Sequence, residues 1–284
     1  MIRLGLIGNG RWGKNYVAAA KLAGNCEVAH ISGPREYVDI DLEKMAYNWD
    51  AIIIATPPEA TAQLAYKALH DYTKPVMIEK PVGLSVEAAQ IVQDAESGCG
   101  KVVLVNHQHL FAPAYEELHR RVKDLPHFQI ATQGGDQKPA HDWPWLWDWA
   151  PHDVAMVLDL GGTDEPELAH AWFDKDSVFA RWRTQRGSAF SHIGVNFGHK
   201  QRRLRVSDHG FHLVYDDRAE HKLTIDNRPI EVSPELPLTR SLRAFAEAVK
   251  NGGTEDRRFG ARWGVTVAKQ IAAMETFACG PENR

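Results

Sequence analysis

Near its start the chain reads Gly8-Asn9-Gly10-Arg11-Trp12-Gly13, directly after the apolar run Leu4-Gly5-Leu6-Ile7 and before a helix-like segment over residues 12–23. Glycine suits a tight turn, and it also suits a backbone that must approach a diphosphate without a Cβ in the way. The start of the following helix offers free N–H groups and a partial positive charge to the phosphates. Because the GxGxxG pattern stands between a strand pattern and a helix pattern, it predicts a dinucleotide-binding turn.

Short continuous apolar runs recur through the first hundred residues, as expected for parallel strands that are covered on both faces. They lie at residues 4–7, 28–31, 51–55, 76–78 and 102–105, with helical patterns over 12–23, 59–70 and 86–96 between them. We therefore expect the fold class α/β, with residues 1–118 forming an N-terminal Rossmann domain around a doubly wound parallel sheet.

Beyond residue 118 the pattern changes to alternating apolar and polar positions, which predict antiparallel strands with one buried face. The alternating segments are 180–185, 189–196, 203–206 and 211–215, and helices are expected over 152–160, 241–250 and 259–277. Residues 119–284 are expected to form an α+β domain on a large, mostly antiparallel sheet. The basic run over 200–205 follows strand periodicity, so we interpret it as a solvated strand face.

Composition excludes several classes of protein. Hydrophobic residues make up 44% of the chain and charged residues 25%, with a formal net charge of −4 and no block of like charge, so we expect no nucleic-acid partner. No apolar run approaches the ~20 residues of a membrane span. Cys26, Cys99 and Cys279 are too few and too scattered for a disulfide scaffold or a zinc site. Because the first predicted strand begins within the first few residues, we expect no signal peptide, and we expect a cytoplasmic protein with no metal site.

Polar side chains follow two of the predicted parallel strands. Lys80, in the run Glu79-Lys80-Pro81, comes just after the strand over 76–78, and Asn106 ends the strand over 102–105. Ligands bind outside the carboxyl ends of the strands in open α/β sheets. Lys80 could therefore direct its ammonium at the nicotinamide end of a cofactor, and Asn106 could line the substrate site. The alternative for Lys80 is an ordinary surface lysine.

Asp148 and His152 are four residues apart and would share one face of a helix. A histidine accepts protons near neutral pH, and the aspartate could orient or pair with the imidazole. Alternatively, Asp148 only caps a helix and His152 is a satisfied buried histidine.

Four tryptophans, at positions 143, 145, 147 and 149, alternate around Asp148. The alternation suggests an extended strand, but Pro144 and Pro151 argue against a central one. We expect at least one ring to line the substrate site and take Trp147 as the candidate. The alternative is packing in the core or at a subunit interface, where large aromatic rings contribute most.

Together these motifs, in this order along the chain, resemble the Gfo/Idh/MocA family, the glucose–fructose oxidoreductase and inositol dehydrogenase group. Ala55-Thr56-Pro57-Pro58 and the segment 106–115 are also similar to that family. The resemblance implies an NAD(P)-dependent oxidoreductase that transfers a hydride between nicotinamide and a secondary alcohol or ketone of a sugar, cyclitol or sugar derivative. It also implies a homodimer or homotetramer that assembles through the C-terminal sheet.

The resemblance also implies roles for single residues. Lys80 would hydrogen-bond the reacting oxygen, His152 would be the general acid/base, and Asp148 would hold the substrate and support the proton transfer. The expected substrate contacts are Asn106, Trp147, Asp148 and His152. The expected cofactor contacts are Gly8, Asn9, Gly10, Arg11, Trp12, Gly13, Ser32, Arg35, Ala55, Thr56, Pro57, Pro58, Glu79 and Lys80.

The turn after the second strand departs from the pattern for NAD, which usually has an acidic residue for the ribose 2′-hydroxyl. This chain has Ser32-Gly33-Pro34-Arg35 there, and a hydroxyl with a guanidinium suits a 2′-phosphate, so the sequence favours NADP over NAD. The alternative is a plain turn with a solvated arginine. The link over 32–50 is short and leaves little room for a full helix.

Two other functions remain open on the same fold. A dinucleotide-sensing regulator would not catalyse a reaction, and it has no reason to keep Lys80, Asp148 and His152 together. A reductase of imines or tetrapyrrole-like compounds would not require the Asp/His pair.

Overall fold

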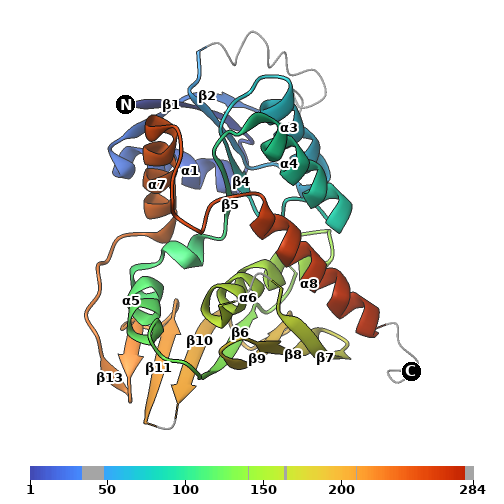
Figure 1. The fold of residues 1–284 in the computed structure, drawn as a ribbon, viewed down its shortest axis with the longest axis vertical. Helices are drawn as coiled ribbons and strands as arrows, with labels where there is room; N and C mark the ends of the chain where they lie inside the picture. The colour runs from blue at the N-terminus through green and yellow to red at the C-terminus, as the bar shows by residue number, and fades with distance from the viewer. Residues whose placement is uncertain (34–47, 140, 163–164, 209, 279–284) are drawn as a thin grey trace. The chain divides into compact units, whose positions relative to one another are not determined.

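The computed structural model describes residues 1–33, 48–139, 141–162, 165–208 and 210–278 (Figure 1). Its contacts divide the chain into two compact units, the first made of residues 1–111 and 235–268 and the second of residues 112–234 and 269 onward. We expected a single division at 118/119. The segment 235–268 returns to the first unit because helix α7 (Pro237–Asn251) packs on helix α1 (Arg11–Ala23).

The first unit contains a five-stranded parallel sheet in the order β2-β1-β3-β4-β5, which confirms the doubly wound prediction. The strands are β1 (Ile2–Ile7), β2 (Cys26–Ser32), β3 (Ala51–Ile54), β4 (Val76–Glu79) and β5 (Val103–Asn106). Every residue of β3, β4 and β5 is buried, as expected for strands covered on both faces.

Helices cover both faces of this sheet, α1 and α7 on one and α3 (Pro58–His70) and α4 (Val86–Cys99) on the other (Figure 1). The sequence places their ends. Pro58 occupies the first turn of α3, where its missing N–H costs nothing. Ser85 caps α4 by accepting a hydrogen bond from the N–H of Ala88 at 3.2 Å, and Gly100 ends α4 in the left-handed region. A short 3₁₀ helix, η2 (Gln108–Phe111), follows β5.

The second unit contains an eight-stranded sheet in the order β13-β12-β11-β10-β6-β9-β8-β7. Neighbouring strands run antiparallel except β6 and β9, which run parallel, so the mostly antiparallel prediction is confirmed. The strands are β6 (Gln129–Gly135), β7 (Glu167–Asp174), β8 (Ser177–Thr184), β9 (Gly187–Gly194), β10 (Gln201–Asp208), β11 (Phe211–Asp216), β12 (Leu223–Ile225) and β13 (Arg228–Pro229).

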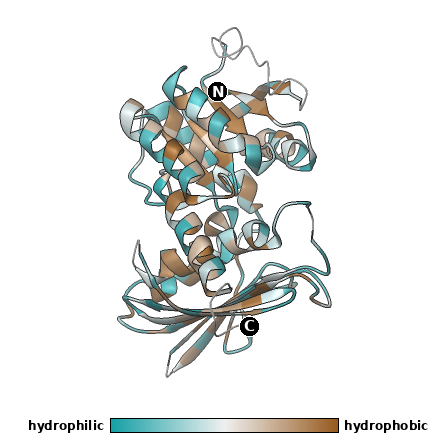
Figure 2. Ribbon diagram, turned by 90° about the vertical axis from the view of Figure 1, so that its right-hand side faces the viewer, coloured by the Kyte–Doolittle hydropathy of each residue, from teal (hydrophilic) through white to brown (hydrophobic). Residues whose placement is uncertain are grey.

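Helix α5 (Pro113–Val122) packs on β11 and β12, and α6 (Trp145–Gly161) packs on β6 and β9. Figure 2 shows these helices on one side of the sheet. Helix α8 (Arg262–Ala278) contributes residues to both units. Within the described ranges, no helix combines the length and the apolar character that crossing a membrane requires.

The tryptophan run corrects one expectation. Residues 143–149 do not form a strand, because α6 begins at Trp145, seven residues before the expected start of the helix, and contains Pro151. From Leu146 to Gly161 every residue except Asp148 is buried. A helix that is buried all round shows no amphipathic stripe, so its first turns carry no helical period that sequence analysis can detect.

Candidate functional site

The glycine turn after β1 has the geometry that its sequence predicts. Gly8 has φ 120°, and a Cβ there would collide with the carbonyl oxygen of Ala55. A Cβ on Gly13 would collide with the carbonyl oxygen of Gly8. By contrast, a Cβ on Gly10 would meet no atom within 4 Å. Gly8 and Gly13 are therefore needed for close packing of the backbone, whereas Gly10 borders open space.

The start of α1 fits the diphosphate of a dinucleotide. Gly10 is the N-cap, no side chain caps the helix, and its first turn has no acidic residue. Its first N–H groups, which have no acceptor within the helix, are therefore suited to anionic oxygens. Asn9, Gly10 and Arg11 are exposed, and Trp12 is partly so, at this end of the helix.

The loops after β2 and β3 lie beside the glycine turn and are held by contacts within the protein. Ser32 is fully buried, and its carbonyl oxygen accepts a hydrogen bond from the N–H of Gly8 at 3.0 Å. After β3, the hydroxyl oxygens of Thr56 and Thr61 are 2.9 Å apart, which ties the Ala55-Thr56-Pro57-Pro58 turn to the first turns of α3. Arg35 lies outside the described residues, as does most of the short link after β2.

A buried hydrogen-bond network joins the carboxyl ends of β4 and β5 to α1. The Tyr16 hydroxyl donates to Oε2 of Glu79 at 2.7 Å. Nδ2 of Asn106 donates to the Tyr16 oxygen at 2.8 Å and to the same Glu79 oxygen at 3.1 Å. Tyr16 and Asn106 are fully buried and Glu79 is 6% exposed. Asn106 is therefore held by protein groups at the strand end, where a substrate contact was expected.

Lys80 directly follows Glu79 and is partly exposed, and the peptide bond that joins it to Pro81 is cis. Burial, and to a smaller extent the charge of Lys80, lowers the pKa of His107 to about 3. His107 is therefore a neutral imidazole at physiological pH. Lys80 is the cation whose charge acts on the pKa of His107 at this end of the sheet.

Asp148 and His152 lie one turn apart in α6 of the second unit. Asp148 is the fourth residue of the helix and does not cap it, because the N-cap is Pro144. His152 is 5% exposed, and Asp148 is partly exposed. Their spacing places them on one face of α6, and the pairing of the carboxylate with the imidazole stays a prediction. Lys80 belongs to the first unit.

An ion pair anchors α6 to the sheet beside His152. Arg202 of β10 donates to the carboxylate of Asp153, and their side chains are 4% and 0% exposed. A Cβ on Gly134 of β6 would collide with both side chains, so glycine leaves the space that the pair occupies. The guanidinium of Arg202 also lies 5.1 Å from the centre of the Trp149 ring. The basic run over 200–205 is thus a solvated face only in part, because Arg202 points inward.

Trp147 is 3% exposed, and its indole N–H donates to Glu275 of α8 at 3.0 Å. Trp143 stacks on His141, with ring centres 3.8 Å apart, and both are partly exposed. The packing of Trp147 within the second unit accounts for its burial without a ligand, as the alternative of core packing anticipated.

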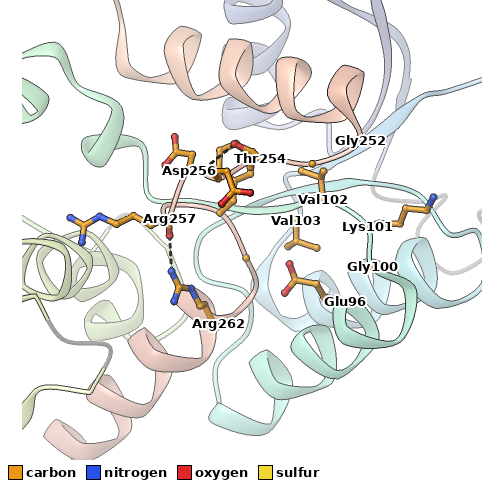
Figure 3. Close-up of a pocket in the computed structure, with 14 residues that line it drawn as sticks. Glu96, Gly100, Lys101, Val102, Val103, Gly252, Thr254, Asp256, Arg257 and Arg262 are labelled. Atoms are coloured by element: carbon orange, nitrogen blue, oxygen red, sulfur yellow. Dashed lines mark hydrogen bonds between the residues drawn. The ribbon is translucent and has the colours of Figure 1, made fainter.

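A cavity of about 470 Å³ lies elsewhere in the first unit, at the amino-terminal end of β5 (Figure 3). Residues from the end of α4, from the start of β5 and from the loop after α7 line it, including Glu96, whose Oε2 accepts a hydrogen bond from the N–H of Ala261. It contains none of the predicted site residues and lies at the opposite end of the strands from Glu79 and Asn106.

Sequence reasoning missed two residues of these clusters. Tyr16 lies in the helix pattern three residues after Gly13, and nothing in the sequence links it to Glu79. Arg202 was hidden among exposed arginines of the same strand. Both are identified by their partners, which are far away in the sequence.

Comparison with known proteins agrees with this architecture. The family model of the Gfo/Idh/MocA proteins, described as "Oxidoreductase family, NAD-binding Rossmann fold", matches residues 2–107. A structure from Magnetospirillum magnetotacticum MS-1, described only as an oxidoreductase, is 30% identical, with a TM-score of 0.81, over 96% of this chain and 99% of that one. The chain belongs to the Gfo/Idh/MocA family.

Two further proteins similar to this chain have names that state a substrate. Inositol 2-dehydrogenase of Agrobacterium fabrum is 24% identical over 208 residues, which are 67% of this chain and 60% of that protein. The chain thus matches less than two thirds of the length of this curated relative. Levoglucosan dehydrogenase in complex with NADH and L-sorbose has a TM-score of 0.82 at 16% identity, covering 98% of this chain and 96% of that one. At that identity the similarity shows the fold alone.

Proposed function

We propose that this protein is an NAD(P)-dependent oxidoreductase that transfers a hydride between nicotinamide and a secondary alcohol or ketone of a sugar, cyclitol or sugar derivative. The observation that carries the proposal is the uncapped start of α1 at Gly10, which borders open space on the same edge of the sheet as Lys80. Membership of an oxidoreductase family supports the reaction class, and the match to inositol 2-dehydrogenase supports the substrate class.

The roles of the side chains follow from the charge that develops on the substrate. Removing a hydride from the carbinol carbon makes that carbon electron-poor, so the hydroxyl proton must leave almost in concert. In our proposal His152 takes this proton, Lys80 donates a hydrogen bond to the same oxygen, and Asp148 supports the imidazolium that forms. When bound, the cofactor supplies the two-electron acceptor for the hydride. In the reverse direction His152 returns the proton to the alkoxide oxygen.

For the cofactor, we propose a preference for NADP, supported by the Ser32-Gly33-Pro34-Arg35 sequence and by the lack of a carboxylate in this turn. The family is described as NAD-binding, and a neighbouring fold is known with NADH, so NAD is the competing choice. Two buried or partly buried cysteines without a disulfide, Cys26 and Cys99, support our proposal of a cytoplasmic location.

We also propose that the sheet of the second unit joins copies of this chain into a homodimer or homotetramer. In β8, Val178, Ala180 and Trp182 are buried against the helices, whereas the alternate residues face outward. Three large side chains are exposed on β7, β8 and β9, namely Trp172, Phe179 and Phe190, at 48%, 47% and 43%. Exposed aromatic residues on adjacent strands are typical of a contact surface.

A sugar and cyclitol panel tests the catalytic proposal. Purified protein with NAD⁺ or NADP⁺ should change nicotinamide absorbance with at least one substrate. His152→Ala should lower kcat by about 10²–10⁴-fold, the usual contribution of a general base, while the cofactor still binds. Arg35→Ala should weaken NADP⁺ binding selectively.

Cofactor binding without turnover of any alcohol or ketone would favour the dinucleotide-sensing regulator. Turnover that His152→Ala leaves unchanged would contradict the roles assigned above and favour a reductase that does not use the Asp/His pair. Equal loss of NAD⁺ and NADP⁺ affinity in Arg35→Ala would contradict a role for Arg35 at the 2′-phosphate.

A further inference from the structure

The first unit buries a carboxylate at its ligand-binding edge, and the catalytic roles proposed above do not use it. Glu79 ends β4 and is 6% exposed. Burying an ionised carboxylate is costly unless other groups compensate its charge. Three residues that are distant in sequence meet at this point, so the arrangement calls for a functional explanation.

Two donors from separate elements converge on one oxygen of this carboxylate. The Tyr16 hydroxyl comes from α1 and the Asn106 amide from the end of β5, at 2.7 and 3.1 Å from Oε2 of Glu79. The same Asn106 nitrogen also donates to the Tyr16 oxygen at 2.8 Å. Because the amide holds the hydroxyl oxygen, the Tyr16 proton is directed at the carboxylate. Two donated hydrogen bonds favour the ionised form of Glu79.

The neighbouring groups keep this charge from being cancelled by proton transfer. Burial, and then the charge of Glu79, raise the pKa of the Tyr16 hydroxyl well above its ordinary value, so Tyr16 remains a neutral donor. His107, next to Asn106, is a neutral imidazole because burial lowers its pKa to about 3. Glu79 therefore supplies negative charge at this corner, and Lys80 supplies positive charge.

The network lies where a bound dinucleotide would extend from the glycine turn. Tyr16 is on α1, less than two turns from Gly10, where the diphosphate would sit. In doubly wound sheets the ribose of the adenosine half is recognised at the end of the second strand, so here that half of a bound dinucleotide would lie towards the end of β2. From the diphosphate, the nicotinamide half therefore extends in the opposite direction, towards the carboxyl ends of β4 and β5, where Glu79 and Asn106 lie.

We propose that Tyr16 and Asn106 hold Glu79 as a buried carboxylate that makes the protein bind oxidised cofactor in preference to reduced cofactor. The oxidised nicotinamide ring carries a positive charge that the reduced ring lacks. A fixed negative charge in a weakly polarisable environment stabilises only the charged ring, and this stabilisation is stronger there than in water. Glu79 thus acts on the redox balance of the bound cofactor, and Tyr16 and Asn106 position the Glu79 carboxylate. This inference rests on the dinucleotide binding proposed above.

Equilibrium binding of both cofactor forms tests the proposal without any substrate. Dissociation constants for the oxidised and reduced cofactors are measured by calorimetry for the wild type, Glu79→Gln and Tyr16→Phe. We expect Glu79→Gln to weaken the binding of the oxidised form relative to the reduced form by about 10-fold, and Tyr16→Phe by about 3-fold. Melting temperatures report whether each variant folds, and Tyr16→Phe, which keeps the aromatic ring, is the milder change.

Two matched controls separate charge at this position from general effects. Glu96→Gln removes a half-buried carboxylate of the same unit at the opposite end of the sheet, beside the cavity of Figure 3. Tyr115→Phe removes a buried tyrosine hydroxyl that donates to Asp159 at 2.7 Å in the second unit. Neither should change the ratio of the two dissociation constants.

Each outcome decides one point. If the wild type binds neither cofactor form, the proposed function fails. If both forms bind and Glu79→Gln or Tyr16→Phe leaves their ratio unchanged, or weakens both equally, Glu79 has only a structural role and this inference is overturned. An equal change of the ratio in Glu96→Gln would overturn it as well, because the effect would then not depend on position.

Discussion

Replacing Arg202 with methionine leaves the carboxylate of Asp153 buried without its ion-pair partner. The two side chains are 4% and 0% exposed, so water cannot take the place of the guanidinium. Breaking such a buried pair costs about 3–5 kcal/mol. For a chain of this size we expect the melting temperature to fall by about 10 °C. Because α6 carries both Asp153 and His152, local loosening should also reduce turnover.

The pH dependence of this loss has a defined sign. Burial raises the pKa of Asp153, and the charge of Arg202 opposes that rise. A carboxyl whose pKa is higher in the folded state than in the unfolded state contributes stability at low pH that is lost as the pH rises through the folded value. Without Arg202 the pKa of Asp153 rises further. The destabilisation in Arg202→Met should therefore be smaller at pH 5 than at pH 8.

Urea unfolding of the wild type and Arg202→Met at both pH values measures the effect. Arg183→Met is the matched control, because Arg183 pairs with Glu167 on the surface of the same sheet, with side chains 64% and 62% exposed. The free energy of unfolding lost in Arg183→Met should be below about 1 kcal/mol. Adding Asp153→Asn to Arg202→Met should recover part of the stability. A loss in Arg202→Met no larger than in the control, or one independent of pH, would refute the reasoning.

Two more predictions concern the glycine turn and the open sheet face. Gly13→Ala should destabilise the protein by about 1–3 kcal/mol, because the added Cβ collides with the backbone of Gly8. Gly10→Ala should leave the melting temperature unchanged and weaken cofactor binding about 10-fold. Similar effects of both variants on stability would contradict the different roles of the two glycines. Phe179→Glu changes a half-exposed residue and should alter stability by no more than about 0.5 kcal/mol, yet reduce the molecular mass in sedimentation. A monomeric wild type would contradict the proposed assembly.

Much of the first unit could be predicted from local patterns. The five parallel strands appear as continuous apolar runs, and the ends of α3 and α4 follow from Pro58, Ser85 and Gly100. The α6 helix was predicted only in its second half, because burial on all sides removes its periodicity. Strand β6 and its parallel pairing with β9 were not identified, since register between strands about sixty residues apart leaves no local signal.

The glycine turn is a property of the chain itself, because steric limits on φ and on a Cβ act within a few residues or against the adjacent strand. The partners of the buried charges, by contrast, are decided by the tertiary structure. Tyr16 meets Glu79 across 63 positions, and Asp153 meets Arg202 across 49. Whether a polar side chain becomes a solvated surface group or a buried partner depends on which elements fold over it, since the cost of burial is offset only by a donor or an opposite charge that the fold brings into place.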